Sequence, residues 1–377
     1  MANALTLIKG ARLYGKQSCD LLTAGGTIVG INSDISLSGV DVQVVDASDC
    51  DLMPGIVDGH VHISGAGGEG GPETRTPEVP QVAMVEAGVT TVVGCQGMDG
   101  ITRSLISLLM KAKGLRNQGI SSWIYTGAYQ VPTPTLSGDV ARDLALFEEV
   151  IGVGEIAIAD HRSSSPTVLE LIKLAKQVRN GGMLGKKAGL VHLHMGDSPD
   201  PFGLIERAVA ESELGFKSFY PTHCNRNSDI HEASKAYGKQ GWIDLTTSSY
   251  AHYSDIEVKP SEAVMELLDA GVPLDHITMS SDGGGSLPHF DEQGNCCRME
   301  IGSLKATWKE VWDLVDAGLQ PERAWQIVSE NPARILKLQG KGRIDIGYDA
   351  DLLLVKEREL VAVMAGGKWL KRPHFSE

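Results

Sequence analysis

Short apolar runs alternate with amphipathic stretches through the middle of the chain, from about residue 55 to residue 343. Runs rich in β-branched residues predict buried strands, and the stretches between them have the apolar spacing of helices. The expected strands are 56–63, 90–95, 122–126, 150–155, 190–194, 219–223, 242–246 and 277–282. Eight strands with helices between them predict an α/β fold, a TIM-like (β/α)8 barrel, rather than an open sheet.

Helical patterns fill most of the intervals between these strands, and many of them end at a glycine, as helices commonly do. The clearest are 77–87, 101–117, 166–180, 201–214, 230–239 and 260–270. One interval stands apart, because residues 283–302 follow the last strand with no helical pattern. A long irregular segment in a compact domain is usually functional, so we expect an active-site loop there.

Both ends of the chain carry short alternating strands separated by Gly, Asn and Asp. These strands are 5–8, 19–22, 27–31 and 42–46 near the start, and 350–355, 360–365 and 368–370 near the end. We expect residues 1–54 and 344–377 to pair into one small β-sandwich domain. Residues 55–343, the barrel domain, would then be an insertion between its two halves.

Side chains that can bind a metal stand at the predicted carboxyl ends of five barrel strands, the face on which barrel enzymes carry their chemistry. They are His60, His62, Glu155, His194, His223 and Asp282. His60 and His62 are two residues apart, so both point to the same face of their strand. His192 would share a face with His194 but lie deeper, so we expect it to be a packing residue.

Four imidazoles and two carboxylates without cysteine suit zinc, and manganese, iron or nickel would also fit. Two ions bridged by a carboxylate and a hydroxide would use the whole set, lower the pKa of the shared water and polarise a carbonyl. Taken singly, His223 could cap a helix, Asp282 could be an N-cap and Glu155 could face solvent. Their joint occurrence at one end of the barrel favours a metal site.

Composition excludes several other classes of function. The net charge is −14, and no basic cluster exceeds short pairs such as Lys186-Lys187, which argues against a nucleic-acid binder. No apolar run reaches the length of a membrane span. Six scattered cysteines without a C-x-x-C pair predict reduced thiols in a cytoplasmic protein.

The segment Gly65 to Gly70 matches the dinucleotide pattern G-x-G-x-x-G after a strand. Glu69 lies inside the pattern and would repel a pyrophosphate, and Pro72 and Pro77 delay the helix that such a site requires. A glycine-rich loop that lets the backbone approach a small substrate fits better.

Eight stretches of the chain are similar to the amidohydrolase superfamily and, within it, to the isoaspartyl (β-aspartyl) dipeptidases. They are PGIVDGHVH (54–62), GGEGGP (67–72), TRTPE (74–78), TGAY (126–129), ADHRS (159–163), HMGDS (194–198), PTHCNRN (221–227) and SSDGGGS (280–286). This resemblance implies a zinc hydrolase of small β-aspartyl dipeptides with a small β domain from both termini. It also implies a homo-oligomer, often an octamer.

The resemblance also assigns roles to individual residues. Asp282 would be a metal ligand and the general base that moves a proton from the attacking hydroxide to the leaving amine. Tyr129 would stabilise charge on the scissile carbonyl oxygen. The substrate-binding residues would be Glu69 for the α-ammonium, and Arg162, Arg226 and Ser286 for the carboxylates. Two arginine forks and one glutamate complement such a dipeptide, although an arginine taken alone more often forms a surface ion pair.

Two positions depart from the family. Its fourth strand usually supplies a carboxylated lysine as the bridge between two metals, and Glu155 stands at that position here. Met98 replaces a threonine near the substrate. A glutamate can bridge without carbon dioxide, but its side chain is shorter, so a one-metal site also fits.

Two other interpretations remain open at this point. The first is another amide hydrolase of the superfamily, such as a hydantoinase or dihydropyrimidinase-like enzyme or an N-acyl amino acid hydrolase, which would not need the Glu69, Arg162 and Arg226 group. The second is a non-catalytic scaffold on the same fold, which predicts missing ligands, whereas only the lysine-to-glutamate exchange is found.

Overall fold

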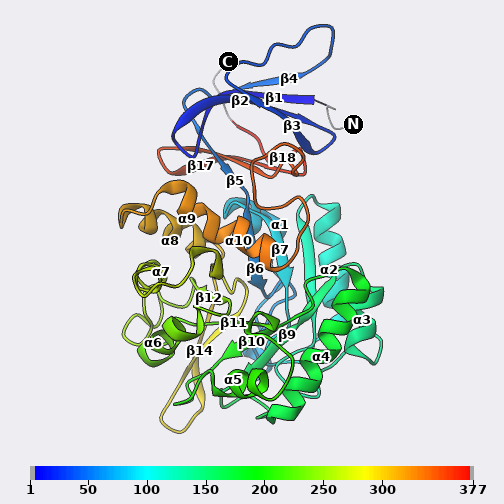
Figure 1. Cartoon of the computed structure of the whole chain (residues 1–377), viewed down its shortest axis with the longest axis vertical. Helices are drawn as coiled ribbons and strands as arrows, with labels where there is room; N and C mark the ends of the chain where they lie inside the picture. The colour runs from blue at the N-terminus through cyan, green and yellow to red at the C-terminus, as the bar shows by residue number, and fades with distance from the viewer. Residues whose placement is uncertain (1–4, 374–377) are drawn as a thin grey trace.

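Eight parallel strands form the centre of the molecule in a computed structural model that describes residues 5–373 (Figure 1). Six of them make one sheet in the order β11-β10-β9-β8-β7-β6, and β12 pairs with β13. The bounds are β6 Ile56–Val61, β7 Val89–Gly94, β8 Ser121–Thr126, β9 Val150–Ile158, β10 Leu190–Met195, β11 Phe219–Thr222, β12 Ile243–Thr246 and β13 Ile277–Ser280. The predicted α/β fold with parallel strands is therefore confirmed.

The parallel sheet is curled, and backbone hydrogen bonds join the six-stranded part to the β12–β13 pair at both sides. Cys224 N donates to Asp244 O at 3.1 Å, next to β11 and β12. Asp282 N donates to His60 O at 3.1 Å, next to β13 and β6. The curl brings the carboxyl ends of distant strands around one centre.

Helices flank the curled sheet on its outer side (Figure 1). Their bounds are α1 Gln81–Glu86, α2 Leu105–Asn117, α3 Val140–Leu146, α4 Val168–Gly185, α5 Gly203–Ala210, α6 Ser228–Tyr237, α7 Pro260–Asp269, α8 Lys305–Asp316, α9 Pro321–Val328 and α10 Glu330–Ile335. The expected end of α4 near residue 180 is wrong. A Cβ on Gly181 would lie 2.5 Å from Ala141 O, and one on Gly182 would lie 2.5 Å from Gly189 Cα, so these glycines permit close packing inside the helix.

Residues 283–302 were expected to form an irregular loop, and this is wrong. They hold an antiparallel hairpin of β14 Ser286–Phe290 and β15 Cys296–Ile301. Asp291 closes its turn by accepting hydrogen bonds from the backbone of Gln293 and Asn295. The hairpin lies at the end of the molecule opposite the terminal strands (Figure 1).

Strands from both ends of the chain share one eight-stranded sheet, in the order β18-β17-β16-β5-β1-β2-β3 with β4 beside β1. Their bounds are β1 Leu5–Leu13, β2 Gln17–Ala24, β3 Thr27–Asn32, β4 Gln43–Asp46, β5 Asp51–Pro54, β16 Leu352–Lys356, β17 Glu359–Ala365 and β18 Lys368–Lys371. The strands expected to form a sandwich thus belong to a single sheet. This sheet folds back on itself, since Ile28 N on β3 donates to Tyr348 O, in the segment that leads into β16, at 2.8 Å. It encloses its own apolar core, which includes Ile8, Leu21 and Leu354.

β5 continues almost directly into β6, and Trp325 Nε1 donates to the carbonyl of Pro54 between them. The boundaries of the two domains at residues 54 and 344 stay a prediction.

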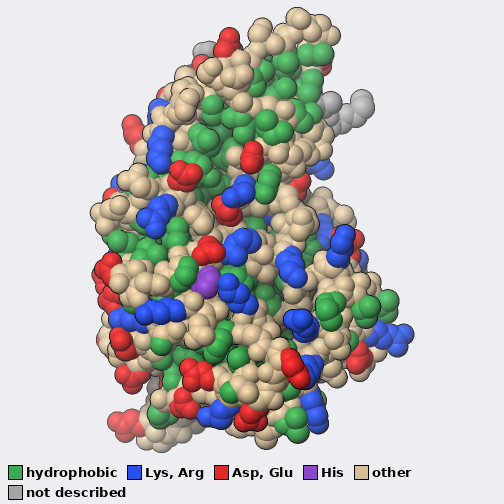
Figure 2. Space-filling view, viewed as in Figure 1, with side chains coloured by type: hydrophobic (Ala, Val, Ile, Leu, Met, Phe, Trp, Pro, Cys, Tyr) green, Lys and Arg blue, Asp and Glu red, His purple; other side chains and the backbone are tan. Residues whose placement is uncertain are grey.

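Apolar side chains gather over the terminal sheet in Figure 2, and Val29, Val40 and Val44 are exposed in this part of the chain. Within residues 5–373, no helix combines the length and the apolar character that crossing a membrane requires.

Candidate active site and metal centre

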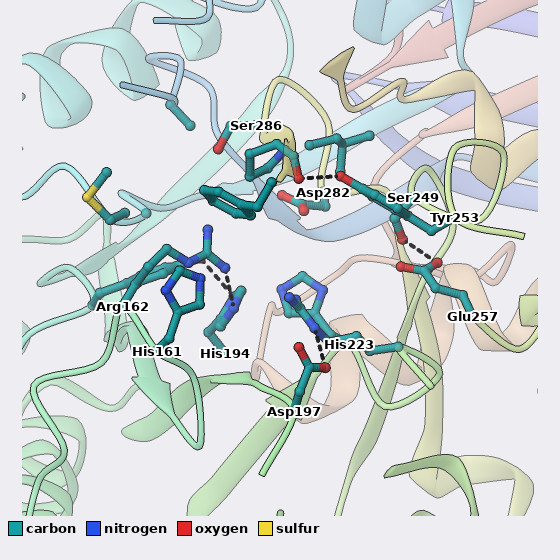
Figure 3. Close-up of a pocket in the computed structure, with 18 of the residues that line it drawn as sticks. His161, Arg162, His194, Asp197, His223, Ser249, Tyr253, Glu257, Asp282 and Ser286 are labelled. Carbon is teal, nitrogen blue, oxygen red and sulfur yellow. Dashed lines mark hydrogen bonds and ion pairs between the residues drawn. The ribbon is translucent and has the colours of Figure 1, made fainter. Parts of the chain in front are cut away.

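The structure brings the predicted metal ligands together at the carboxyl ends of the curled sheet. All of them are buried: His60, His62, Glu155, His194, His223 and Asp282. They come from five strands that are far apart in sequence, so the curl of the sheet creates the cluster. His194, His223 and Asp282 surround the pocket in Figure 3.

One group of ligand atoms contains His60, within β6, and His62, directly after it. His62 Nε2 is 3.1 Å from Asp282 Oδ1 and 3.6 Å from Glu155 Oε2. His60 Nε2 is 3.4 Å from Glu155 Oε2 and 3.6 Å from Asp282 Oδ1. Two imidazole nitrogens and two carboxylate oxygens therefore face one point. The Cys95 sulfur, which sequence reasoning did not propose as a ligand, is 3.7 Å from His62 Nδ1.

The other oxygen of Glu155 faces a different pair of histidines. Glu155 Oε1 is 2.8 Å from His194 Nδ1 and 3.1 Å from His223 Nε2. Its two oxygens thus point to two separate histidine pairs. This is the arrangement that a carboxylate needs in order to bridge two cations.

Several of these buried atoms lie close to an oppositely charged or imidazole group but make no hydrogen bond with any described residue. They are His60 Nε2, Glu155 Oε2 and Asp282 Oδ1. Buried polar atoms almost always have partners, and buried charges are paired or coordinate metals. All three atoms belong to the first group of ligands, so the residues fit a metal ion at that point.

The pKa shifts in the cluster differ from one ligand to another. Burial alone would raise the pKa of Glu155, but His60 and His194 hold that pKa well below its ordinary range. Burial and the neighbouring His194 lower the pKa of His223 to about 4. Glu155 is therefore ionised and His223 is neutral, as metal ligands must be. Although burial opposes it, Glu155 raises the pKa of His60, and Cys95 and Asp282 raise the pKa of His62, well above the ordinary value, so a metal ion would displace protons from these two side chains.

The backbone at the ligands is unusual. His223 has φ 61° and Asp282 has φ 53°, in the left-handed region that few residues other than glycine adopt. A break in register in β9, where it pairs with β10, falls at Glu155. Such irregularities re-aim side chains and concentrate at functional sites. Asp58 supports the arrangement, because its Oδ1 accepts hydrogen bonds from His60 N and Ser281 N.

A cavity of about 320 Å³ opens onto this cluster. Four of the residues expected at the substrate line it: Tyr129, Arg162, Arg226 and Ser286. Met98, one of the two departures from the family, lines it as well. Glu69 lies beside Ser286, whose hydroxyl donates to Glu69 Oε1 at 2.7 Å, and Glu69 Oε2 is buried without a partner among the described residues.

Arg162 is held in the site by Asp160, an acid that sequence reasoning missed. Its Nε and Nη2 donate to the two oxygens of Asp160 at 3.0 and 2.9 Å, and its Nη1 is 3.4 Å from Glu69 Oε1. Asp160 Oδ2 is also 3.0 Å from His194 Nε2. The available signal was its position two residues before Arg162, within the stretch ADHRS (159–163).

Arg226 and Tyr129 reach the cavity from different elements. Arg226 Nε is 3.0 Å from Asp197 Oδ1, which orients the guanidinium. The Tyr129 hydroxyl is 2.8 Å from His194 Nδ1, beside the second histidine pair. Burial raises the pKa of Tyr129 well above its ordinary value, so the phenol keeps its proton and can act as a donor.

Known proteins are similar to this chain in sequence and in fold. A model of the amidohydrolase family matches residues 222–370. The crystal structure of β-aspartyl dipeptidase from Fervidobacterium islandicum AW-1, in complex with the β-Asp-Leu dipeptide, superposes with a TM-score of 0.91 and 38% identity, over 98% of this chain and 97% of that chain. An allantoinase from Enterococcus faecalis is 22% identical over 91% of this chain and 84% of its own length. An adenine deaminase from Bacillus velezensis is 24% identical over 93% of this chain but only 54% of its own length.

The chain therefore belongs to the amidohydrolase family and is a hydrolytic enzyme. Its predicted resemblance to the β-aspartyl dipeptidases is confirmed by the similarity to the Fervidobacterium enzyme along nearly the whole of both chains.

Proposed function

We propose that this protein is a zinc-dependent hydrolase, built on a (β/α)8 barrel, that cleaves the β-aspartyl bond of dipeptides. The observation that carries the proposal is the charge pattern around the cavity. Arg162 and Arg226 offer two cations and Glu69 offers one anion beside the ligand cluster. A β-aspartyl dipeptide has two carboxylates and one ammonium, so each of its charged groups would find a group of opposite charge here, with Asp160 and Asp197 orienting the two arginines. The dipeptide bound to the Fervidobacterium enzyme supports the same substrate class.

The ligand atoms fit two metal ions. His60, His62 and Asp282 would hold one ion, His194 and His223 would hold the other, and Glu155 would bridge them. Two such ions supply a water of lowered pKa and polarise the substrate carbonyl. Nitrogen and oxygen ligands favour zinc.

The chain's own residues supply proton transfer and orientation. Asp282 lies at the inner wall of the cavity and is placed to accept a proton from the attacking water and return it to the leaving amine. The Tyr129 phenol is placed to donate a hydrogen bond to the carbonyl oxygen as charge develops there. Glu69 Oε2, buried and without a partner among the described residues, would accept the α-ammonium. Arg162, Arg226 and Ser286 would bind the carboxylates.

The direct test compares β-aspartyl-leucine with α-aspartyl-leucine, with metal content measured on the same sample. Only the β isomer should be cleaved, because the fixed charges of Arg162, Arg226 and Glu69 distinguish where its ammonium and carboxylate lie. Losing a charged contact costs on the order of 2–5 kcal/mol, so Arg226→Ala should lower kcat/KM at least about thirtyfold.

Arg207→Ala is the matched control, because this arginine is exposed and pairs with Asp200 outside the cavity. A loss below about threefold in Arg226→Ala would remove Arg226 from the binding site, since it corresponds to under roughly 1 kcal/mol. Cleavage of hydantoin or N-acyl amino acids without cleavage of β-aspartyl-leucine would favour the other amide hydrolases of the family.

We also propose that the protein is a homo-oligomer. Apolar side chains gather over the terminal sheet in Figure 2, and such surface is typical of interfaces. Val29, Val40 and Val44 are exposed in this part of the chain. Sedimentation velocity should show an oligomer, and Val44→Glu should shift it toward smaller species. Val82→Glu, on α1 and as exposed as Val44, is the control. A monomer in the unmodified protein would contradict the proposal.

A further inference from the structure

Glu257 lies on the wall of the same cavity, in the segment between β12 and α7. Its Oε2 accepts a hydrogen bond from Ser249 Oγ at 2.8 Å. Figure 3 shows Glu257, Ser249 and Tyr253 across the cavity from Arg162. No sequence motif marks this position, and neither the metal ligands nor the proposed substrate contacts account for it.

The other acids around the cavity already have a cationic or imidazole partner. Asp197 Oδ1 is 3.0 Å from Arg226 Nε, Asp282 Oδ1 is 3.1 Å from His62 Nε2, and Glu69 Oε1 is 3.4 Å from Arg162 Nη1. Glu257 differs from them. In the described part of the chain, Ser249 is the group that hydrogen-bonds its carboxylate, and no Lys, Arg or His nitrogen forms an ion pair with it.

An apolar surface lines the same cavity as this carboxylate. It consists of Tyr253, Ile256, Leu287, Pro288 and Phe290. The Tyr253 hydroxyl donates to Pro288 O at 2.9 Å, which joins the Glu257 segment to the β14–β15 hairpin. An aliphatic stem could pack on this surface while a charged end reaches Glu257, as long basic side chains do elsewhere in proteins.

We propose that the subsite for the leaving residue selects a basic side chain, whose cationic end pairs with Glu257 while its stem packs on the apolar surface. This inference rests on the proposed β-aspartyl dipeptidase function. Glu257 is then a specificity-determining residue for that reaction.

The charges that face Glu257 set how the selection varies with pH. Burial raises the pKa of Glu257 to about 8; Ser249 and Arg226 oppose the rise, whereas Asp282 and Asp197 add to it. The nearby Tyr253 phenol stays neutral in this range, because burial raises its pKa to about 12. Glu257 gains its charge as pH rises through about 8, while a lysine ammonium keeps its own charge there. The preference should therefore strengthen with rising pH.

The test compares kcat/KM for β-aspartyl-lysine and β-aspartyl-norleucine, which share a stem and differ by the ammonium, between about pH 7 and pH 9. We expect lysine to be preferred by about tenfold at the upper end, as for a charge-assisted hydrogen bond, and less at the lower end. β-Aspartyl-glutamate should be the poorest substrate. In Glu257→Gln the lysine-to-norleucine ratio should fall toward one and lose its pH dependence.

Asp255→Asn is the matched control, because Asp255 is an exposed acid two residues away that does not line the cavity. It should leave both the activity and the ratio unchanged. If Glu257→Gln keeps the ratio and its pH dependence, or if Asp255→Asn lowers the ratio equally, this inference is overturned while cleavage of β-aspartyl-leucine stands. If no β-aspartyl peptide is cleaved, the proposed function fails and the inference fails with it.

Discussion

Replacing Asp282 by asparagine is expected to lower kcat for β-aspartyl-leucine by roughly a thousandfold, the scale of a lost general acid–base group. Asparagine keeps the shape and one oxygen of the side chain, but it cannot take a proton at neutral pH. Metal content should fall far less than activity, because the histidines and Glu155 remain. Steady-state kinetics and elemental analysis of the same sample separate the two effects.

Because Asp282 has a strained backbone, Asp282→Asn could lose activity through a change in folding, and a folding control separates the two effects. Asp282 has φ 53° and its Oδ1 lies 3.1 Å from His62 Nε2. Asparagine tolerates the left-handed region about as well as aspartate does, so the melting temperature should change little. Asp255→Asn gives the same change of charge outside the cavity and should keep full activity. A variant at position 282 that retains more than about a tenth of the activity would exclude Asp282 as the general base.

Glu155→Gln should remove much of the bound metal as well as the activity. Glu155 Oε1 lies 2.8 Å from His194 Nδ1 and its Oε2 lies 3.4 Å from His60 Nε2, so one carboxylate serves both histidine pairs. A neutral amide offers one ligand oxygen and no charge to two cations. Glu155→Ala should be worse still. Metal stoichiometry, measured by elemental analysis after dialysis, reports the loss independently of turnover.

Glu155 also determines what the metal-free protein requires in order to bind zinc again. A lysine bridge forms by reaction with carbon dioxide, so enzymes that carry one can require bicarbonate during reconstitution. A glutamate near neutral pH is ionised without that step. Zinc reconstitution of the unmodified protein should therefore proceed equally with and without bicarbonate. Normal metal content in Glu155→Gln would instead show that Glu155 is not the bridge.

Much of the fold could be predicted because its signals are local. β-branched runs and glycine stops marked all eight parallel strands, and the spacing of His60 and His62 marked one ligand pair. The β14–β15 hairpin escaped prediction because its strands are mostly half-buried or exposed and carry charges such as Arg298 and Glu300. The extension of α4 depends on glycines that contact distant backbone, which helix propensity does not report.

The residues of the candidate site also separate into those that local sequence signals predict and those that they do not. Residues at strand ends could be named, since topology alone brings such ends together. The directions in which the two Glu155 oxygens point could not be predicted, because they follow from an irregularity in the pairing of β9 with β10. Asp160 and Glu257 were also not predicted, since their surroundings arise from segments remote in sequence. Asp160 contacts His194, and Glu257 lines the same cavity as residues of the hairpin.

Asp160 stands between the metal ligands and the substrate pocket. Its Oδ2 lies 3.0 Å from His194 Nε2 and 2.9 Å from Arg162 Nη2. We therefore expect a shift of His194 on metal binding to move the arginine that would clamp the dipeptide. Thermodynamic linkage would make this effect mutual, so a metal that tightens the binding of a dipeptide would itself be held more tightly while the dipeptide is bound. Through this one shared carboxylate, occupancy by cation and by peptide is expected to be cooperative.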